Sequence, residues 1–389
     1  MTGVQTCALP ISRRHLLRAA LAGAALAPWA RLSLAASGVV PSPTAKRFVL
    51  VILRGGLCGL TAVPALGDPA FAEARGPLAT WVGEPLPLDT TFALNPLLPQ
   101  LHALYGQGEL AVVHAVGLPY RERSHFDAQQ VLESGGTRPY ELATGWLGRA
   151  IHRTGAATPI KAVALETAVP LVLRGPAEVD TWAPSVLPEP AADLVARLES
   201  MYRNDPALAQ ALMRARDLRA EPGMAANPQA MGGGGGGGGG RGAAVALARK
   251  TAEFLQRGSQ VAVMELGGWD SHANQAAPGG ALSNNLRLLD STLAALHQGL
   301  VDGGTWGHTV VLVASEFGRE VAINGTQGTD HGTGGAALVL GGAVRGGRVL
   351  TDWPGLAKKD RFEGRDLRIT TDLRQVLRPI LAQHLQVPQ

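Results

Sequence analysis

The sequence predicts an α/β protein built as a three-layer α/β/α sandwich around a mostly parallel sheet. Short apolar runs rich in β-branched residues alternate along the chain with helical patterns of ten or more residues, which is typical of βαβ units. Several runs are apolar almost throughout, as expected for strands covered on both faces. With 389 residues, 46% hydrophobic and 17% charged, the chain can bury a large core, and we expect a single domain over residues 46–389.

The first half of the chain supplies the leading elements of this pattern. The run KRFVLVIL predicts a buried strand that leads at once into the loop RGGLCGL. Further apolar runs predict strands at 110–116, 160–165 and 169–173. Helical periodicity predicts helices at 68–80 and 94–105, a helix that opens after Ser124 and ends at Gly135, and an amphipathic helix at 193–219 broken near Pro206.

The second half repeats the alternation after a glycine tract. Nine consecutive glycines lie within residues 222–242, which we expect to form a flexible insertion because such a run has no side chains to bury. The tract does not follow a strand, so its match to a nucleotide-binding glycine pattern carries no weight. Beyond it the sequence predicts helices at 243–256, 283–300 and 371–385, and strands at 260–266, 308–315, 336–342 and 344–350.

Two N-terminal segments stand outside the predicted domain. Residues 1–11 match the translation of a common sequencing-adapter oligonucleotide, and we treat them as an assembly artefact. Residues 12–36 combine an arginine pair at 13–14, a moderately apolar run and small residues suited to cleavage. This pattern predicts a twin-arginine signal peptide and a periplasmic or secreted protein. The alternative, a buried or membrane-spanning N-terminal helix, is weaker because the run is shorter than the ~20 residues that a bilayer requires and contains Arg18.

Charge and cysteine content exclude other classes. The net charge is +4 with a pI near 9.3, but only five of the 35 basic residues are lysines and the positive charges are scattered. Because no basic patch is interleaved with aromatic residues, we expect no nucleic-acid partner. The mature chain would contain only Cys58, which excludes an intrachain disulfide. No flavin, haem or iron–sulfur motif is present.

Asp270 and His272 form the first candidate metal-binding pair. They lie in GGWDSHANQ, directly after a predicted strand. Two residues apart in an extended segment, they would point to the same side and reach one cation. An Asp-x-His pair also arises by chance, and the alternative is that Asp270 stabilises a turn while His272 is solvated.

A second group follows the predicted strand HTVVLVAS. Glu316, Asp330 and His331 lie in the loop behind it, among glycines that permit a close approach of the backbone. Ligands of open α/β sheets bind outside the carboxyl ends of strands. A mixed carboxylate and imidazole set suits zinc, whereas a set richer in oxygen suits magnesium, manganese or calcium. Asp330 and His331 can also be read as an ordinary turn residue and an ordinary loop histidine.

The segment PYRERSHFDAQ combines a helix start with positive charge. Ser124 opens the helix, Asp127 follows at the spacing of a capping box, and Arg121 and Arg123 lie beside it. Ser124 is a candidate nucleophile in an anion-binding pocket, with His125 or Asp127 near a metal. The alternative is a capped helix with solvated arginines. No GxSxG, HExxH or P-loop lysine motif is present, so the enzyme classes that depend on those motifs lose their usual support.

Several long motifs carry a family resemblance in their order along the chain. They are LRGGLCGLTAVPA, PYRERSHFDAQ, ELGGWDSHANQ, SEFGREVAINGTQGTDHGTGGAALVLGGAVRGG and the DWPGL segment. From about Phe48 to the C-terminus the chain resembles the bacterial domain of unknown function 1501 family. That family is similar to the alkaline phosphatase-like superfamily, whose members are exported α/β/α proteins that hydrolyse phosphate or sulfate esters with one or two metal ions. The resemblance therefore implies this fold and this activity.

The resemblance also implies site residues. Asp270, His272 and His331 resemble the ligands of one metal, and Glu316 with the residue at position 58 resemble the ligands of a second. The family loop usually reads GGxDG, whereas this chain carries Cys58 in place of the aspartate. A thiolate binds zinc well and magnesium or calcium poorly. The alternative is that Cys58 is a small buried residue in a site that has lost one metal.

These observations predict a hydrolase that uses a divalent metal ion, zinc before magnesium, manganese or calcium, to cleave a phosphate or sulfate ester. Ser124 is the expected nucleophile, and Arg121, Arg123 and Arg319 are expected to hold the anionic group of a small ester substrate. The alternative is a non-catalytic binding or assembly protein of the cell envelope that keeps the hydrolase fold with a degenerate metal site. Its partner would be an envelope component or a second exported protein.

Overall fold

The computed structural model describes residues 44–154, 160–184, 192–206, 208–209, 212–213 and 239–388. The predicted artefact, the predicted signal peptide and residues 222–238 of the predicted insertion lie outside these residues. Helix α7 (Ala192–Tyr202) belongs to a separate compact unit from the other described elements, and it ends before Pro206, where the sequence predicts a break. No helix in the described part of the chain is long and apolar enough to cross a membrane.

The main unit is built on a nine-stranded sheet with the order β10-β4-β9-β8-β1-β7-β5-β6, and β11 also pairs with β4. The strands are β1 (Arg47–Leu53), β4 (Leu110–Gly117), β5 (Ala162–Ala164), β6 (Val179–Thr181), β7 (Val261–Leu266), β8 (Thr309–Ser315), β9 (Gly335–Leu340), β10 (Arg348–Leu350) and β11 (Thr371–Asp372). Only β9 runs antiparallel to its neighbours within this sheet, which confirms the prediction of a mostly parallel sheet. A separate two-stranded sheet joins β2 (Leu86–Pro87) to β3 (Ala93–Leu94).

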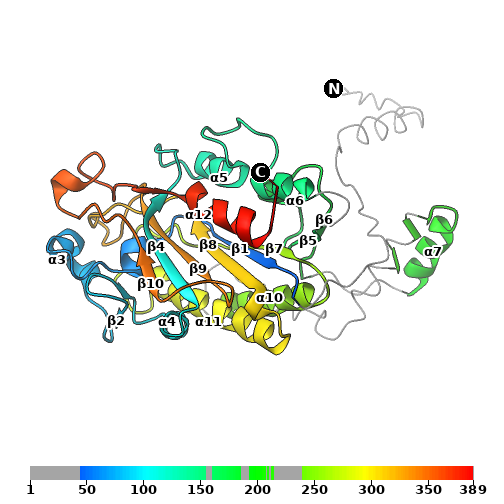
Figure 1. Ribbon diagram of the computed structural model, residues 1–389, viewed down its shortest axis with the longest axis horizontal. Helices are drawn as coiled ribbons and strands as arrows, with labels where there is room; N and C mark the ends of the chain where they lie inside the picture. The colour runs from blue at the N-terminus through cyan, green and yellow to red at the C-terminus, as the bar shows by residue number, and fades with distance from the viewer. Residues whose placement is uncertain are drawn as a thin grey trace, which may run out of the picture. The chain divides into compact units, whose positions relative to one another are not determined.

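Helices cover both faces of the nine-stranded sheet (Figure 1). β1 is buried along its whole length, and alternate side chains join different cores: Val49 and Val51 lie in one, Leu50 and Ile52 in the other. The first core includes residues of α4 (Pro99–Gly106), α10 (Gly239–Gln256) and α11 (Ala281–Asp302). The second includes residues of α5 (His125–Ser134), α6 (Trp146–Arg153) and α12 (Leu373–Pro379). The predicted three-layer arrangement is therefore confirmed.

Prolines and glycines account for the elements that differ from prediction. The run at 169–173 forms a 3-10 turn at Leu171–Leu173 rather than a strand, because Pro170 cannot donate to a sheet ladder. The helix expected at 68–80 is cut to α3 (Phe71–Arg75) and a 3-10 turn by Gly76 and Pro77. The helix expected at 94–105 begins only at Pro99, a residue suited to the first helical position.

Two further boundaries depend on the same residue types. The closing helix predicted at 371–385 divides at Pro379 into α12 and a π-helical turn at Ile380–His384. At the other end of the glycine tract, α10 begins at Gly239, inside the segment expected to be a flexible insertion.

Three parallel strands bring their carboxyl ends to one edge of the sheet. β1 pairs with β7 on one side and with β8 on the other, and all three run in the same direction. β4 also runs this way, because β9 is antiparallel to both β4 and β8. The loops that follow these strands therefore meet at the edge where α/β proteins commonly bind ligands.

Candidate metal centre

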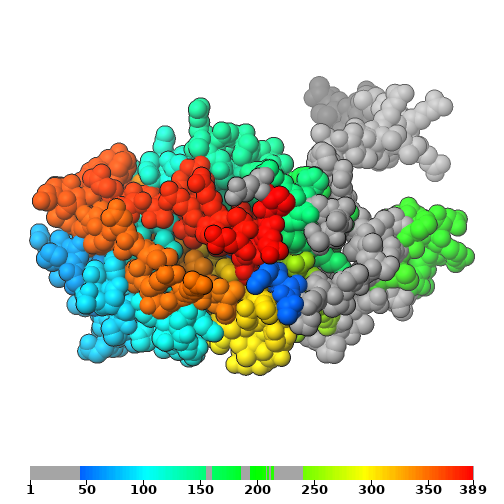
Figure 2. Space-filling model, in the orientation of Figure 1, coloured from blue at the N-terminus to red at the C-terminus, as the bar shows by residue number. Residues whose placement is uncertain are grey.

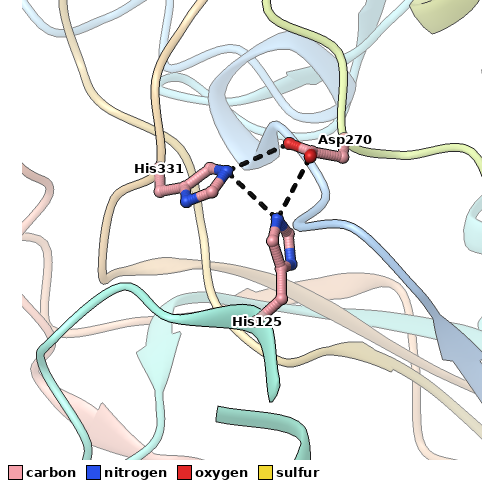
Figure 3. Close-up of side chains that lie close together, drawn as sticks. All are labelled: His125, Asp270 and His331. Carbon is pink, nitrogen blue, oxygen red and sulfur yellow. Dashed lines mark hydrogen bonds and ion pairs between the residues drawn. The ribbon is translucent and has the colours of Figure 1, made fainter. Parts of the chain in front are cut away.

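Three side chains from distant segments point toward one another at this edge (Figure 3). Asp270 lies in the loop after β7, His331 in the loop between β8 and β9, and His125 in the first turn of α5, which follows β4. His125 Nε2 lies 3.0 Å from His331 Nε2 and 3.3 Å from Asp270 Oδ2, and His331 Nε2 lies 3.1 Å from Asp270 Oδ1. The three ligand atoms are all within 4.8 Å of one another, which allows them to hold one metal ion.

His272 places a further donor beside this group. Its Nε2 lies 2.7 Å from Asp270 Oδ1 and 3.1 Å from His331 Nε2. In a tetrahedral zinc site with bonds of about 2.0–2.1 Å, neighbouring ligand atoms are about 3.3 Å apart. The spacing of these nitrogens and oxygens therefore suits a small divalent ion.

Each imidazole directs its Nδ1 to an oxygen acceptor. The acceptors are Glu316 Oε1 for His125 (2.7 Å), Asp330 Oδ1 for His272 (3.0 Å) and the carbonyl of Arg123 for His331 (3.0 Å). An Nδ1–H that donates to such an oxygen leaves the Nε2 lone pair free for a metal. The Nε2 lone pairs of His125 and His331, 3.0 Å apart, repel each other unless a proton or a cation lies between them. The donor set therefore fits a divalent metal ion.

A buried arginine holds the carboxylate of the group. The Arg319 side chain has no exposed surface, and its Nη1 donates to Asp270 Oδ1 at 2.7 Å. The same guanidinium donates to the carbonyls of Gly55, Ser271 and Thr329 and so connects the loops after β1, β7 and β8. Burial raises the pKa of Asp270, but the hydrogen bonds from Arg319 and His331 outweigh it and hold that pKa well below its usual range. Asp270 is thus held as a charged carboxylate.

Two carboxylates contact the Nδ1 atoms of the imidazoles: Glu316 contacts His125 and Asp330 contacts His272. Glu316 is buried directly after β8, and its Oε1 accepts from His125 Nδ1. This contact raises the pKa of His125, because the carboxylate stabilises a charged imidazolium. Asp330 is more exposed and lies between His272 and Asn324, whose amide donates to it at 3.0 Å. Hydrogen bonds from Asn324 and His272 lower the pKa of Asp330, so it too is an anion beside an imidazole.

Cys58 lies in a different hydrogen-bonded environment. Its Sγ is 3.1 Å from Thr61 Oγ1 and 3.2 Å from Arg75 Nη2, both of them buried. Burial alone raises the pKa of the thiol, but the nearby Arg75 charge and the Thr61 hydrogen bonds outweigh it, and the net shift is downward. Cys58 and Glu316 are absent from the group of ligand atoms described above. Their assignment to a second metal remains a prediction.

The residues expected to bind or attack a substrate have other contacts. Ser124 is the N-cap of α5, as predicted, but its side chain makes no capping hydrogen bond, so the capping box does not form. Arg121 Nη1 donates to the carbonyl of Leu118 at 2.6 Å, and the Arg123 guanidinium pairs with Asp366 and Glu363. The Arg319 guanidinium donates to Asp270 and to three backbone carbonyls. An anion-binding role for all three arginines therefore stays a prediction.

The backbone approaches closely at two glycines near the site, and for Gly328 this agrees with the close approach predicted for its loop. Gly55 has a φ of 120°, and a Cβ at this position would collide with the backbone of Trp269 and Asp270. At Gly328 a Cβ would collide with the backbone carbonyl of His272. Any other residue at these two positions would push the loop that carries Asp270 and His272 away from its neighbours.

His125 is the member of this group that the sequence did not single out. The sequence places it next to Ser124 at the start of a helix, where either His125 or Asp127 could lie near a metal. In the structure Asp127 instead accepts from the Tyr120 hydroxyl at 3.2 Å. A histidine in the first turn of a helix that follows a strand is a weak pattern, and only the position of β4 in the sheet brings His125 to Asp270.

Comparison with known families gives one match over most of the chain. The family model described as "Protein of unknown function (DUF1501)" matches residues 104–386. This range contains His125, Asp270 and His331 but not the loop with Cys58. No curated protein matches the chain.

Solved structures resemble the chain at low identity. The protein Ps i-CgsB in complex with k-i-k-neocarrahexaose has a TM-score of 0.45 at 9% identity, over 89% of this chain and 73% of that chain. A sulfatase from Pseudoalteromonas sp. has a TM-score of 0.41 at 14% identity, over 78% and 64% of the two chains. A protein in the alkaline phosphatase superfamily from Vibrio parahaemolyticus has a TM-score of 0.40 at 14% identity, over 80% and 64%. The chain thus spans about two thirds of the length of the last two, and scores of this size do not transfer an activity to it.

Proposed function

The chain belongs to the DUF1501 family, and from that premise we propose that it is an exported hydrolase that uses a divalent metal ion to cleave a phosphate or sulfate ester. One observation carries the proposal. The Nε2 atoms of His125, His272 and His331 lie within 3.3 Å of an Asp270 carboxylate oxygen, while each Nδ1 has its own acceptor. Side chains preorganised in this way are typical of metal ligands rather than of a solvated polar surface.

The residues around the centre have separable tasks in such a reaction. When bound, a divalent ion supplies a Lewis acid and a template for an anionic ester. His125, His331 and Asp270 would hold the ion, with His272 as a further donor beside them, and Arg319 keeps Asp270 charged and oriented. Ser124, next to His125 in the chain, is the proposed nucleophile at the N-terminus of α5, where backbone N–H groups favour negative charge. The export part of the proposal rests on residues 12–36 and is tested by exchanging the arginine pair at 13–14 for lysines, which should retain the protein in the cytoplasm.

The central test combines metal analysis with a substrate screen. Protein purified without chelator should contain about one equivalent of divalent metal and should hydrolyse a chromogenic phosphate or sulfate ester. His125→Ala should lose most of both, whereas His102→Ala, which removes a histidine that contacts only the carbonyl of Pro87 in the described hydrogen bonds, should lose neither. Metal-free wild-type protein without turnover, under conditions in which added zinc is not taken up, would contradict the proposal.

A second candidate function is kept because of position 58. The loop that in the resembling family supplies a metal-binding aspartate carries Cys58 here, and Cys58 contacts Thr61 and Arg75. This departure favours a cell-envelope binding protein that keeps the fold and one metal but lacks turnover. Metal uptake by His125, Asp270 and His331 without hydrolysis of any ester in the screen would favour this second function.

A further inference from the structure

We propose that Glu316 is a positioning residue, not a metal ligand: its carboxylate fixes the tautomer and the orientation of His125, so that Nε2 of this imidazole faces the metal. The inference rests on the proposed metal function and assigns to Glu316 a different task from the one that the family resemblance implies.

Burial and hydrogen bonding surround Oε1 of the Glu316 carboxylate with donors. The side chain has no exposed surface. Its Oε1 accepts from His125 Nδ1 at 2.7 Å, from the Gly55 backbone N–H at 2.8 Å and from Gln129 Nε2 at 3.3 Å. The Ser315 hydroxyl lies 3.1 Å from Oε2. A cation bound at Oε1 would have to displace three N–H groups whose hydrogens point at the same oxygen, so this oxygen is suited to organise donors rather than to ligate a metal.

The donors come from two elements that the carboxylate joins. Gly55 lies in the loop after β1, beside Asp270. His125 and Gln129 lie four residues apart on α5, so both project from the same face of the helix toward Glu316. One carboxylate therefore sets the rotation of the first turn of α5 and its distance from the loop after β1. This turn is the element that brings His125 to the other ligands.

Among the three imidazoles, His125 depends most on a single buried anion. His331 is held through Nδ1 by a backbone carbonyl, which no side-chain substitution removes. His272 is held by Asp330, whose side chain is 50% exposed and whose loss water can partly replace. The Glu316 side chain is 0% exposed, so its replacement leaves His125 Nδ1 without a charged acceptor.

The test compares the full-length wild type with Glu316→Gln, each stripped of metal and titrated with zinc against a competing chelator. We expect Glu316→Gln to weaken zinc binding by about 10- to 100-fold at unchanged stoichiometry, because loss of a carboxylate behind a histidine ligand has effects of this size. Glu133→Gln is the matched control. Glu133 lies on α5, the helix that carries His125, and is buried like Glu316, but its carboxylate accepts from Arg54 and from the Val172 amide. This variant should bind zinc like the wild type.

A second readout does not depend on metal uptake. Nitrogen NMR of histidine side chains in the metal-free wild type should show His125 protonated at Nδ1, with that signal lost or shifted in Glu316→Gln. Loss of one of two zinc ions in Glu316→Gln, with the affinity of the other unchanged, would make Glu316 a ligand and overturn the inference, as would equal zinc affinity in both proteins. If the wild type binds no zinc, the proposed function fails, and the NMR experiment alone tests the positioning role. A His125 tautomer that is the same in the wild type and in Glu316→Gln overturns this role. A tautomer that changes in Glu316→Gln supports it.

Discussion

At His125 the two ring nitrogens have different tasks. Nδ1 contacts Glu316 at 2.7 Å, while Nε2 faces His331 at 3.0 Å. The same division holds at His272 and His331, each with its own Nδ1 acceptor. A neutral imidazole has one donor and one acceptor nitrogen. The oxygen that accepts from Nδ1 therefore decides whether Nε2 carries the lone pair that faces the candidate metal centre.

Cys58 leads to a prediction at the same scale. Its sulfur contacts Arg75 and Thr61, so the buried Arg75 guanidinium uses it as an acceptor. Cys58→Ala should destabilise the protein by about 1–3 kcal/mol, since the buried Arg75 guanidinium loses one of its acceptors and keeps Thr61 and two backbone carbonyls. Cys58→Asp should retain an acceptor and leave the zinc content unchanged. Urea unfolding and metal analysis of both variants check this, and an additional bound metal in Cys58→Asp would instead indicate a degenerate second site.

At the scale of elements, a charge cluster connects α5 to the sheet away from the metal centre. Arg54, directly after β1, pairs with Glu133 on α5 and with Glu265 on β7. Glu166, in the loop after β5, lies beside Glu265, since β5 and β7 pair in parallel. Three carboxylates thus lie near one guanidinium, which pairs with two of them, Glu133 and Glu265. Burial, the nearby charge of Glu265 and a hydrogen bond to it raise the pKa of Glu166 to about 7.

Stability should therefore depend on pH through Glu166. Its pKa is 4.5 in the unfolded chain and about 7 in the folded protein, so between these values the native state binds more protons than the unfolded state. The free energy of unfolding should fall as the pH rises from 4.5 to 7 and then level off as far as this group is concerned. Glu166→Gln should flatten that part of the curve, while Glu84→Gln, at an exposed glutamate, should leave it unchanged. The unfolding free energy of each protein is measured by urea unfolding at several pH values. If it changes equally with pH between 4.5 and 7 in Glu166→Gln and in the wild type, this assignment is contradicted.

At the scale of the whole molecule, the candidate ligands come together only in the folded state. His125, Asp270 and His331 lie on three segments that are separated by whole strands and helices of the main unit. The unfolded chain cannot present such a set to one ion, so binding of a metal ion by these residues would be coupled to folding.

Zinc should accordingly stabilise the native protein. At a free concentration 1,000 times its dissociation constant, an ion that binds only the folded state adds about 4 kcal/mol, and a chelator removes that gain. We expect Tm to rise by several degrees on addition of zinc to metal-free protein and to return when chelator is added. His331→Ala should lose most of this shift, whereas His102→Ala, outside the centre, should keep it. A zinc shift of equal size in all three proteins would place the binding site elsewhere.

The α/β alternation, the apolar character of β1, β7 and β8, and the types of residue that follow the last two strands can all be read from the amino-acid pattern alone. These features are local: strand burial shows in runs of apolar residues, and proline or glycine marks most of the ends that shifted. Asp270, His272 and His331 were therefore predictable as candidates. The tertiary structure decided that His125 joins them, that Glu316 lies behind His125, and that Cys58 contacts Arg75. These contacts depend on strand order and on the approach of loops far apart in sequence, which no local pattern of residues specifies.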